Sequence, residues 1–358
     1  MPFRERQSMR MKKISVIVPC YNAADYLGKC IEQLLCQTIG IDHIEIILVD
    51  DASTDEGATK KMIQKYEQQF PDTVKAVFLT QNMRQGGARN VGIAYAEGEY
   101  ITFCDADDWL LKETLEHSYH AAKEHGADIV SFARKCVSTR DNFENVERGG
   151  KSRLCELDTL KKKKAFLLNR QEEDYGSQNK LFRLSMIRKN QISFAEYYSM
   201  EEAAFTIPAR LYAKKIYYLD EKLYIYYLSP GSTMRGDDWE KRKWDNLQVW
   251  MIIMEELKSR GFFQDYCKEI EYLFFTQGIA WGLGFLFKRG SILTKEEWES
   301  VADTVEKMIP DIRKNPYIIS EDNLFDRLWN DLVLRSLEMK FSDESAEQVN
   351  RAMREAMQ

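Results

Sequence analysis

The sequence has few of the residues that build metal clusters and disulfide frameworks. Its 358 residues include only 7 cysteines and 4 histidines, with no Cys-x-x-Cys pair and no His-Glu-x-x-His pattern. These absences exclude a disulfide-stapled scaffold, a four-cysteine zinc site and the usual zinc site of a metalloprotease. An odd number of scattered cysteines is typical of a reducing compartment, so we expect a cytoplasmic location.

Several motifs that hold phosphates or carry a nucleophile are also absent. No Gly-x-Gly-x-x-Gly follows the first apolar run, no complete Walker loop occurs, and there is no Gly-x-Ser-x-Gly. These absences argue against a dinucleotide-binding domain, a P-loop NTPase and an α/β-hydrolase.

The chain has no excess of positive charge. Lys and Arg together number 51 against 57 Asp and Glu, which gives a formal net charge of −6. A nucleic-acid partner is not expected, because such a footprint is usually basic. The 44% of apolar and 30% of charged residues are typical of a globular protein with an ample core.

Long apolar runs are missing as well. The longest uncharged stretch, residues 272–287, falls short of the ~20 residues of a spanning helix and contains Gln277. We interpret it as a buried helix, and its aromatics leave open a peripheral membrane contact. The first apolar run, residues 14–18, is too short for the core of a signal peptide and predicts a buried strand.

Strand and helix patterns alternate over the first 132 residues. Apolar, β-branched runs predict strands at 14–18, 44–49, 74–79, 100–104 and 128–132. Helical spacing lies between them at 24–37, 57–70, 86–96 and 112–125. This alternation predicts βαβ units and a mostly parallel sheet flanked by helices.

The alternation stops after residue 132. The chain is then mixed and rich in tyrosine, and beyond residue 236 its pattern is helical. We therefore expect a first domain at 1–132, a second region at 133–235 and a helical C-terminal region at 236–358. The C-terminal helices could pack on the core, pair two copies as a homodimer or touch a membrane.

Polar residues follow three of the expected strands. They are Pro19-Cys20-Tyr21-Asn22, Asp50-Asp51 and Asp105-Ala106-Asp107-Asp108. Ligands of open α/β sheets bind outside the carboxyl ends of strands, so these segments predict a shared site. The Asp105-x-Asp107 spacing suits a hard cation such as Mg²⁺ or Mn²⁺ shared with a substrate's phosphates, although a helix cap and turn is an equally good interpretation of it alone.

Together these segments resemble a known family. The stretches ISVIVPCYNAADYLGKCIEQLLCQT, IEIILVDDASTDEG and GGARNVGIAYAEGEYITFCDADDWL stand in order, followed by QNKLFR and MEEAAF. They resemble the family 2 glycosyltransferases with the GT-A fold, which are inverting enzymes that use nucleotide-diphosphate sugars. The resemblance implies a Rossmann-like, mostly parallel sheet flanked by helices, with the helical C-terminal region outside the shared pattern.

The resemblance also implies roles for individual residues. Pro19 and Tyr21, with Asn22 in the same loop, correspond to the nucleobase pocket. Asp51 corresponds to the carboxylate that accepts a hydrogen bond from the base, and Arg89 to an arginine near the donor. Asp105 corresponds to a ribose or sugar contact and a metal-site residue, Ala106 lies between the two aspartates, and Asp107 corresponds to the direct ligand of Mn²⁺ or Mg²⁺. Asp108 is expected to cap or pack.

The expected catalytic base departs from the family pattern. The family usually has Glu-Asp before an apolar helix, with the Asp as base, and here the segment reads Met200-Glu201-Glu202. By register Glu202 takes the base's place, with one extra methylene. Glu201 is an alternative base, and a weakly active enzyme is a third possibility. The pair Glu173-Asp174 is a further alternative, but it precedes QNKLFR, whereas the family's base follows that segment. The purely structural interpretation of Glu201-Glu202 is a solvated helix start.

The resulting hypothesis is an inverting, metal-dependent transfer of a sugar from a nucleotide-diphosphate sugar, with UDP favoured, in polysaccharide or glycan synthesis. The acceptor would be a glycan or a lipid-linked sugar, reached from the cytoplasm at the inner face of the membrane. Two rivals remain. A sugar-1-phosphate nucleotidylyltransferase has a similar sheet but usually a glycine-rich first loop, and a non-catalytic member would bind the sugar nucleotide without turnover.

Overall fold

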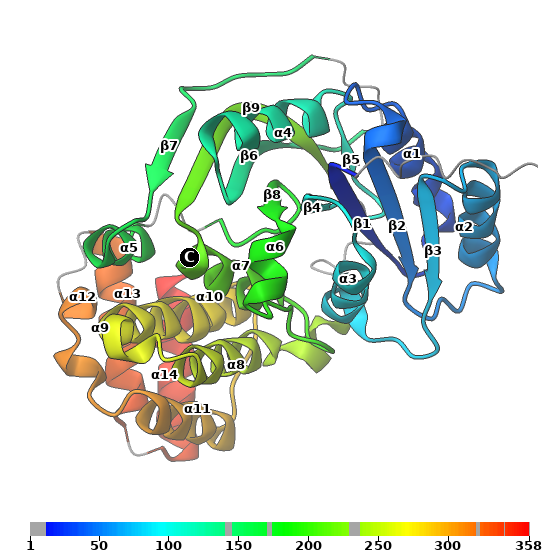
Figure 1. Ribbon diagram of the computed structural model, residues 1–358. Helices are drawn as coiled ribbons and strands as arrows, with labels where there is room; N and C mark the ends of the chain where they lie inside the picture. The colour runs from blue at the N-terminus through cyan, green and yellow to red at the C-terminus, as the bar shows by residue number, and fades with distance from the viewer. Residues whose placement is uncertain are drawn as a thin grey trace, which may run out of the picture. The chain divides into compact units, whose positions relative to one another are not determined.

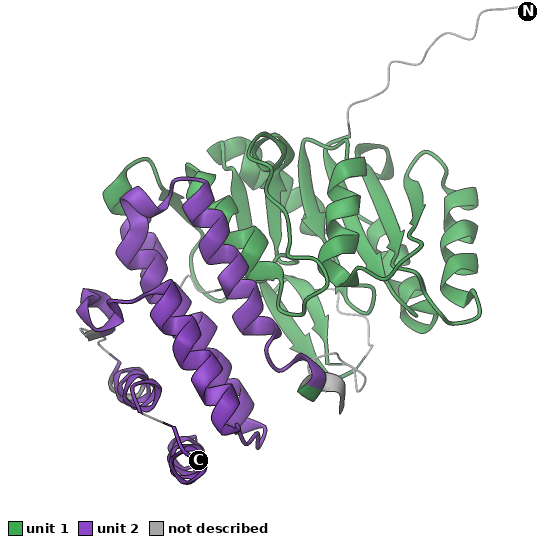
Figure 2. Ribbon diagram, turned by 90° about the horizontal axis from the view of Figure 1, so that it is seen from below, with its two compact units in different colours: residues 1–162, 174–240 green, residues 163–173, 241–358 purple. Residues whose placement is uncertain are grey.

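The computed structural model describes residues 12–139, 145–169, 174–228, 237–319, 323–339 and 341–357. The chain forms two compact units, which Figure 2 shows in separate colours. The first comprises residues 1–162 and 174–240, and the second comprises residues 163–173 and 241–358. The region expected at 1–132 falls in the first unit, as does the region expected at 133–235 apart from residues 163–173, and a boundary between these two regions stays a prediction.

The first unit is built on a curled mixed sheet (Figure 1). Four parallel strands form one side of it, in the order β3 (Val74–Phe78), β2 (Ile44–Asp50), β1 (Ile14–Cys20) and β4 (Tyr100–Phe103). The sheet continues through β8 (Lys180–Arg183), β6 (Ile129–Val137), β9 (Lys215–Tyr227) and β5 (Trp109–Leu110), and β7 (Arg153–Glu156) pairs with β9. The strand β8 is antiparallel to both of its neighbours.

Helices cover both faces of this sheet. The apolar faces of α1 (Ala24–Leu35), α2 (Ala58–Gln69) and α4 (Thr114–His125) pack into one cluster with Ile14, Val16 and Val18 of β1. The other face carries α3 (Arg84–Tyr95), α6 (Leu184–Lys189) and α7 (Glu202–Tyr212). There a ring cluster of Phe103, Phe182, Phe194 and Phe205 joins β4 and β8 to α7.

The five strands and four helices expected in the first 132 residues are all present, with ends shifted by a few residues. The strands β5, β7, β8 and β9 were not expected. They are two to four residues long except β9, whose 13 residues are a mixture of buried and half-buried positions without regular alternation. Short strands and a half-buried, tyrosine-rich strand give too weak a period for recognition.

The strand β1 lies at the point where the strand order reverses direction. Its pairing with β4 ends at Ile17 opposite Phe103, while its pairing with β2 runs on to Cys20 opposite Asp50. The two neighbours of β1 therefore part at its carboxyl end. This is the place where α/β sheets bind ligands, and all three expected loops follow these strands.

The second unit is helical in the residues that the structure describes. Its helices are α8 (Asp245–Ser259), α9 (Phe263–Leu273), a π-helix (Phe274–Ala280), α10 (Trp281–Lys288), α11 (Lys295–Met308), α12 (Pro316–Ile319), α13 (Leu324–Leu337) and α14 (Asp343–Ala356). Two further elements, α5 (Leu160–Leu167) and the 3-10 turn Asp237–Arg242, cross the borders of the units. The helical C-terminal region is confirmed.

The uncharged run of residues 272–287 lies in the helical stretch Phe263–Lys288, which α9, the π-helix and α10 form end to end with a kink at Tyr266. By length and composition this helix could cross a membrane, but 78% of its apolar window is buried. It packs against α8, α13 and α14. The Nδ2 of Asn246 in α8 donates to the carbonyls of Gln277 and Gly278 at 3.0 and 3.1 Å, satisfying acceptors in the π-helical turns. The expected buried helix is confirmed.

Candidate active site

The loop after β1 is braced by Asn22. Its backbone is left-handed (φ 49°), which asparagine tolerates better than most residues. Its Oδ1 accepts from the N–H of Thr54 at 2.7 Å, and its own N–H donates to the Oγ of Ser53 at 2.9 Å. The loops after β1 and β2 are thus tied together, and the ring of Tyr21 beside them is 49% exposed.

Asp51 sits at the end of β2 and is only 3% exposed. Its Oδ1 accepts from the N–H of Met83 at 2.7 Å, and its carbonyl accepts from the side chain of Asn82 at 3.1 Å. Burial raises the pKa of its carboxyl to about 6. Pro19, by contrast, is buried within β1 opposite Val49, so its backbone shapes the strand end rather than offering an exposed surface.

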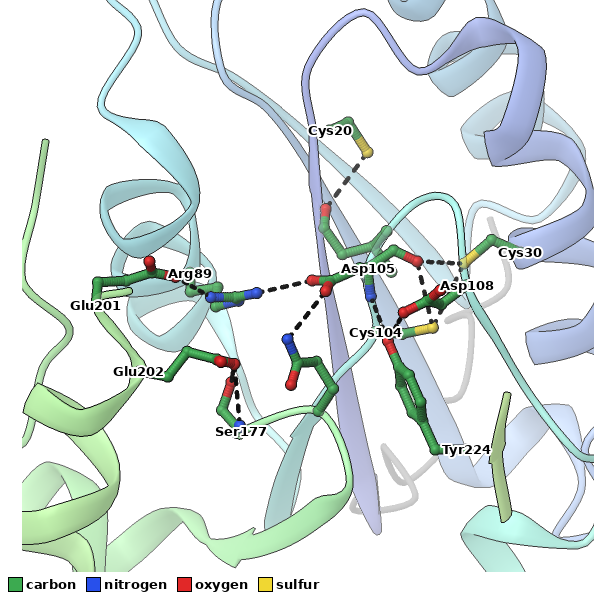
Figure 3. Close-up of polar contacts among 12 residues, drawn as sticks. Cys20, Cys30, Arg89, Cys104, Asp105, Asp108, Ser177, Glu201, Glu202 and Tyr224 are labelled. Atoms are coloured by element: carbon green, nitrogen blue, oxygen red, sulfur yellow. Dashed lines mark hydrogen bonds and ion pairs between the residues drawn. The ribbon is translucent and has the colours of Figure 1, made fainter. Parts of the chain in front are cut away.

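Arg89 lies between Glu201 and Asp105 in the polar cluster of Figure 3. It projects from α3 with no solvent exposure, and its guanidinium donates to Oδ1 of Asp105 at 2.7 Å and to Oε1 of Glu201. Burial by itself would lower the pKa of Arg89, but the carboxylates of Asp105 and Glu201 raise it above its ordinary value, so the side chain stays charged. Burial also raises the pKa of Glu201 to about 7.

Two other residues of the GGARN segment explain how α3 comes so close to the residues before α7. A Cβ on Gly86 would lie 2.2 Å from the carbonyl oxygen of Ala195 and 2.8 Å from Cγ of Glu201. The side chain of Asn90 accepts from the N–H of Phe194 at 2.8 Å and donates to the carbonyl of Phe194 at 3.0 Å. Glycine is thus needed for the close approach, and Asn90 fixes it.

In the acidic loop after β4, Asp105 and Asp108 make their hydrogen bonds on different sides. Oδ2 of Asp105 accepts from Nε2 of Gln178 at 2.9 Å, so both of its carboxylate oxygens are hydrogen-bonded. Asp108 is buried, and it accepts from the Tyr224 hydroxyl at 2.6 Å and the Tyr227 N–H at 2.8 Å. Burial raises the pKa of Asp108 to about 8. Asp108 therefore packs, as expected.

Ala106 and Asp107 are half-buried at the same turn. Among the described residues, no group of three or more His, Cys, Asp or Glu side chains forms a ready-made metal cage. A cation that takes one or two carboxylates and the rest of its ligands from phosphates and water does not need one. The loop after β4, which carries the carboxylate of Asp107, has the type of oxygen donor that such a site uses.

Glu201 and Glu202 are adjacent in sequence but differ in their surroundings, as Figure 3 shows. Glu201 is 3% exposed and faces Arg89. Glu202, the first residue of α7, is half-buried, and its Oε1 accepts from the N–H of Ser177 at 3.1 Å and from the Ser177 hydroxyl at 3.0 Å. Of the alternative pair, Glu173 lies outside the described residues, and Asp174 is bound by Lys180 at 3.1 Å.

The structure brings Arg89, Asp105 and Glu201 into direct contact, and Gln178 and Ser177 link Glu202 to the same cluster. Asp51 is tied instead to the start of α3. Sequence reasoning missed Ser177, Gln178 and Asn90. The quoted segments contained Gln178 and Asn90, but only contact with distant carboxylates and backbone reveals their roles.

Comparison with known proteins identifies the family. The profile described as Glycosyl transferase family 2 matches residues 15–190. The glycosyltransferase GlyG of Streptococcus pneumoniae is 31% identical over 232 residues, covering 63% of this chain and 73% of GlyG. The poly(ribitol-phosphate) beta-glucosyltransferase of Bacillus spizizenii is 32% identical over 205 residues, covering 57% of this chain but only 30% of that protein.

The fold has a counterpart among solved structures. The crystal structure of residues 1–349 of TarS from Staphylococcus aureus, in complex with UDP-GlcNAc, matches with a TM-score of 0.70 at 22% identity and covers 96% of this chain and 91% of that one. Against full-length TarS, a poly(ribitol-phosphate) beta-N-acetylglucosaminyltransferase, the sequence match spans about a third of the length of that relative. The mixed sheet, its flanking helices and the helical C-terminal region are those of a GT-A glycosyltransferase, and the chain belongs to glycosyltransferase family 2.

Proposed function

We propose that the chain transfers a sugar from a UDP-sugar to a hydroxyl of a glycan acceptor, with inversion at the anomeric carbon. The observation that carries the proposal is the linked cluster at the β1 switch point. There the half-buried carboxylate of Glu202 is joined through Ser177 and Gln178 to Asp105. Asp105 lies on what we call the donor rim, the edge of the sheet formed by the loops after β1, β2 and β4. A carboxylate base beside the strand ends where the sugar nucleotide would bind is what a single displacement requires.

The donor would lie across the ends of β1, β2 and β4. The exposed ring of Tyr21 offers a stacking surface for the base, and the buried carboxylate of Asp51 is an acceptor for an imide N–H of uracil. Asp105, fixed by Arg89 and Gln178, would accept from a hydroxyl of ribose or sugar. Family membership and the UDP-GlcNAc named for the TarS structure support UDP as the nucleotide.

A divalent cation, Mn²⁺ or Mg²⁺, is part of the proposal. When bound, it would neutralise charge on the leaving diphosphate and act as a Lewis acid. Asp107 would hold it, whereas Asp105, whose two oxygens already accept from Arg89 and Gln178, would act chiefly by holding the guanidinium and the donor. A direct metal bond from Asp105 stays a prediction.

Glu202 fits the role of base better than Glu201. The carboxylate of Glu201 is buried against a guanidinium and has no exposed path to an acceptor. Glu202 would take the proton of the acceptor hydroxyl while that oxygen forms a bond to the anomeric carbon and the bond from this carbon to UDP breaks. The transition state resembles the oxocarbenium ion of glycoside hydrolysis, and no covalent enzyme intermediate forms.

The acceptor proposal rests on the relatives. Their names include poly(ribitol-phosphate) transferases and a beta-1,3-glucosyltransferase that acts on an undecaprenol-linked glycan in Campylobacter jejuni. We extend this to a polysaccharide or lipid-linked glycan acceptor for the present chain, met on the cytoplasmic side of the membrane. The whole-protein activities of the longer relatives are not carried over.

The test is donor turnover. The purified chain is incubated with UDP-glucose, UDP-GlcNAc or UDP-galactose, with Mn²⁺ or with EDTA, and UDP release is measured with and without poly(ribitol phosphate) or glycan acceptors. We expect metal-dependent release that falls at least tenfold with EDTA or Asp107→Ala. Calorimetric donor binding without any release would favour the non-catalytic alternative instead.

A further inference from the structure

We propose that Ser177 is a positioning residue for the base, holding one oxygen of Glu202 so that the other accepts the proton. This inference rests on the proposed function. The N–H and the hydroxyl of Ser177 both donate to Oε1 of Glu202, at 3.1 and 3.0 Å. Among the described residues, Oε2 has no hydrogen bond to the protein, so it is the oxygen available to an acceptor hydroxyl.

Ser177 can act as a reference point because hydrogen bonds tie its own loop together. Its side chain has no exposure to solvent. The buried ammonium of Lys180 donates to Oδ2 of Asp174 at 3.1 Å, to the carbonyl of Gly176 at 2.6 Å and to Oδ1 of Asn179 at 3.0 Å. The loop of residues 174–180 is therefore closed on a central cation, and Ser177 is held within it.

The same loop also reaches the donor rim. Gln178, the residue next to Ser177, donates to Oδ2 of Asp105, whose other oxygen accepts from Arg89. Arg89 then contacts Glu201, the neighbour of Glu202. The contacts close a ring from the base through the loop to the donor rim and back, so the loop sets the spacing between base and donor.

The ring gives a physical reason why glutamate can stand where the family usually has aspartate. A glutamate side chain has one more torsion than aspartate, and a base that swings loses the proximity on which proton transfer depends. Two donors on a single oxygen remove that freedom. The longer side chain of Glu202 and its contact with Ser177 would therefore act as one unit.

A double-mutant cycle tests this inference. Ser177→Ala is expected to lower kcat about tenfold, the worth of a hydrogen bond to a charged group, with the donor KM unchanged. Glu202→Asp keeps a base of the family's usual type but withdraws its carboxylate from Ser177. Adding Ser177→Ala to Glu202→Asp should then change kcat by less than about twofold, because the interaction is already lost.

Thr206→Val is the matched control. The Thr206 hydroxyl is buried and donates to the carbonyls of Tyr175 and Glu202, next to the same loop, but does not touch the carboxylate of Glu202. This variant should keep kcat within about twofold, and thermal unfolding checks that every variant is folded.

Three outcomes decide the matter. The non-additive pattern supports the inference. An active wild type whose kcat is unchanged by Ser177→Ala, or falls by the same factor in the Glu202→Asp background, overturns it alone, since a purely structural serine behaves that way. A folded wild type without turnover on any donor overturns the proposed function and this inference with it.

Discussion

Glu201 and Arg89 form an ion pair that solvent does not reach. The side chain of Arg89 has no exposed surface and that of Glu201 has 4%. Two charges withdrawn from water repay their desolvation only if each stays paired and hydrogen-bonded. Here the guanidinium has a second carboxylate, Asp105, at 2.7 Å, so the donor rim and the residues before α7 share one cation.

Removing the guanidinium of Arg89 should destabilise the fold. Arg89→Met would leave two buried carboxylates without a counter-charge, and we expect the free energy of unfolding to fall by about 3–5 kcal/mol. Urea denaturation followed by tryptophan fluorescence measures this loss. In Arg89→Met/Glu201→Gln one of the orphaned charges is gone, so this double variant should recover part of it. If the double variant is the less stable of the two, the pair does not work as described.

The two neighbouring glutamates should respond differently to amide replacement. Glu202→Gln removes the proposed base, and we expect kcat to fall by about 10²–10⁴-fold while calorimetric donor affinity is kept. Glu201→Gln keeps the shape but weakens the pair with Arg89, so it should act mainly on stability and donor affinity. A larger loss of kcat in Glu201→Gln than in Glu202→Gln would make Glu201 the base.

The sequence predicted the donor half of the molecule well because its strands are fully buried. All seven residues of β1 and all seven of β2 are buried, and such runs stand out without any partner information. The strand β8 is only four residues long and pairs antiparallel with β4, far away in sequence. Nothing local marks it as a strand, so its place in the sheet could not be predicted.

The same contrast holds for the site. The segments with Asp51, Asp105 and Arg89 were recognisable by pattern, and their places at strand ends followed from the parallel sheet. The hydrogen bonds from Ser177 to Glu202 and from Gln178 to Asp105 join residues 25 and 73 positions apart. Serine and glutamine before a short strand carry no chemical signature of their own, so only the folded chain reveals them.

Donor binding should depend on pH through Asp51. Burial raises the pKa of this carboxyl from 3.8 to about 6, so its ionisation costs stability as pH rises through that window. Donor affinity should follow the opposite course, because the ionised carboxylate is a stronger acceptor for a uracil N–H than the protonated carboxyl. Below pH 6 we expect the Kd of a UDP-sugar to rise by up to about tenfold per pH unit.

Asp51→Asn is the control for that titration. In the wild type the N–H of Met83 donates to Oδ1 of Asp51 at 2.7 Å, and the amide oxygen of the asparagine can accept the same hydrogen bond. The variant should bind the donor with an affinity that does not change between pH 5 and 7, as measured by calorimetry with an intact UDP-sugar. The same pH dependence in wild type and variant would assign the titration to another group.

Gly86→Ala should displace the segment that carries Glu201 and Glu202. The added Cβ would lie 2.2 Å from the carbonyl oxygen of Ala195 and 2.8 Å from Cγ of Glu201, so the segment before α7 must move. Overpacking of this kind costs about 1–3 kcal/mol, and a shift of Glu201 carries Glu202 with it, so kcat should fall as well.

Gly28→Ala is the matched change, since in α1 its Cβ would meet nothing closer than the Tyr66 hydroxyl at 3.8 Å. Alanine is the better helix former, so Gly28→Ala should keep kcat and gain up to about 1 kcal/mol of stability. Equal effects of the two substitutions on kcat and on the unfolding midpoint would show that the close approach of α3 to Glu201 is not what sets the base.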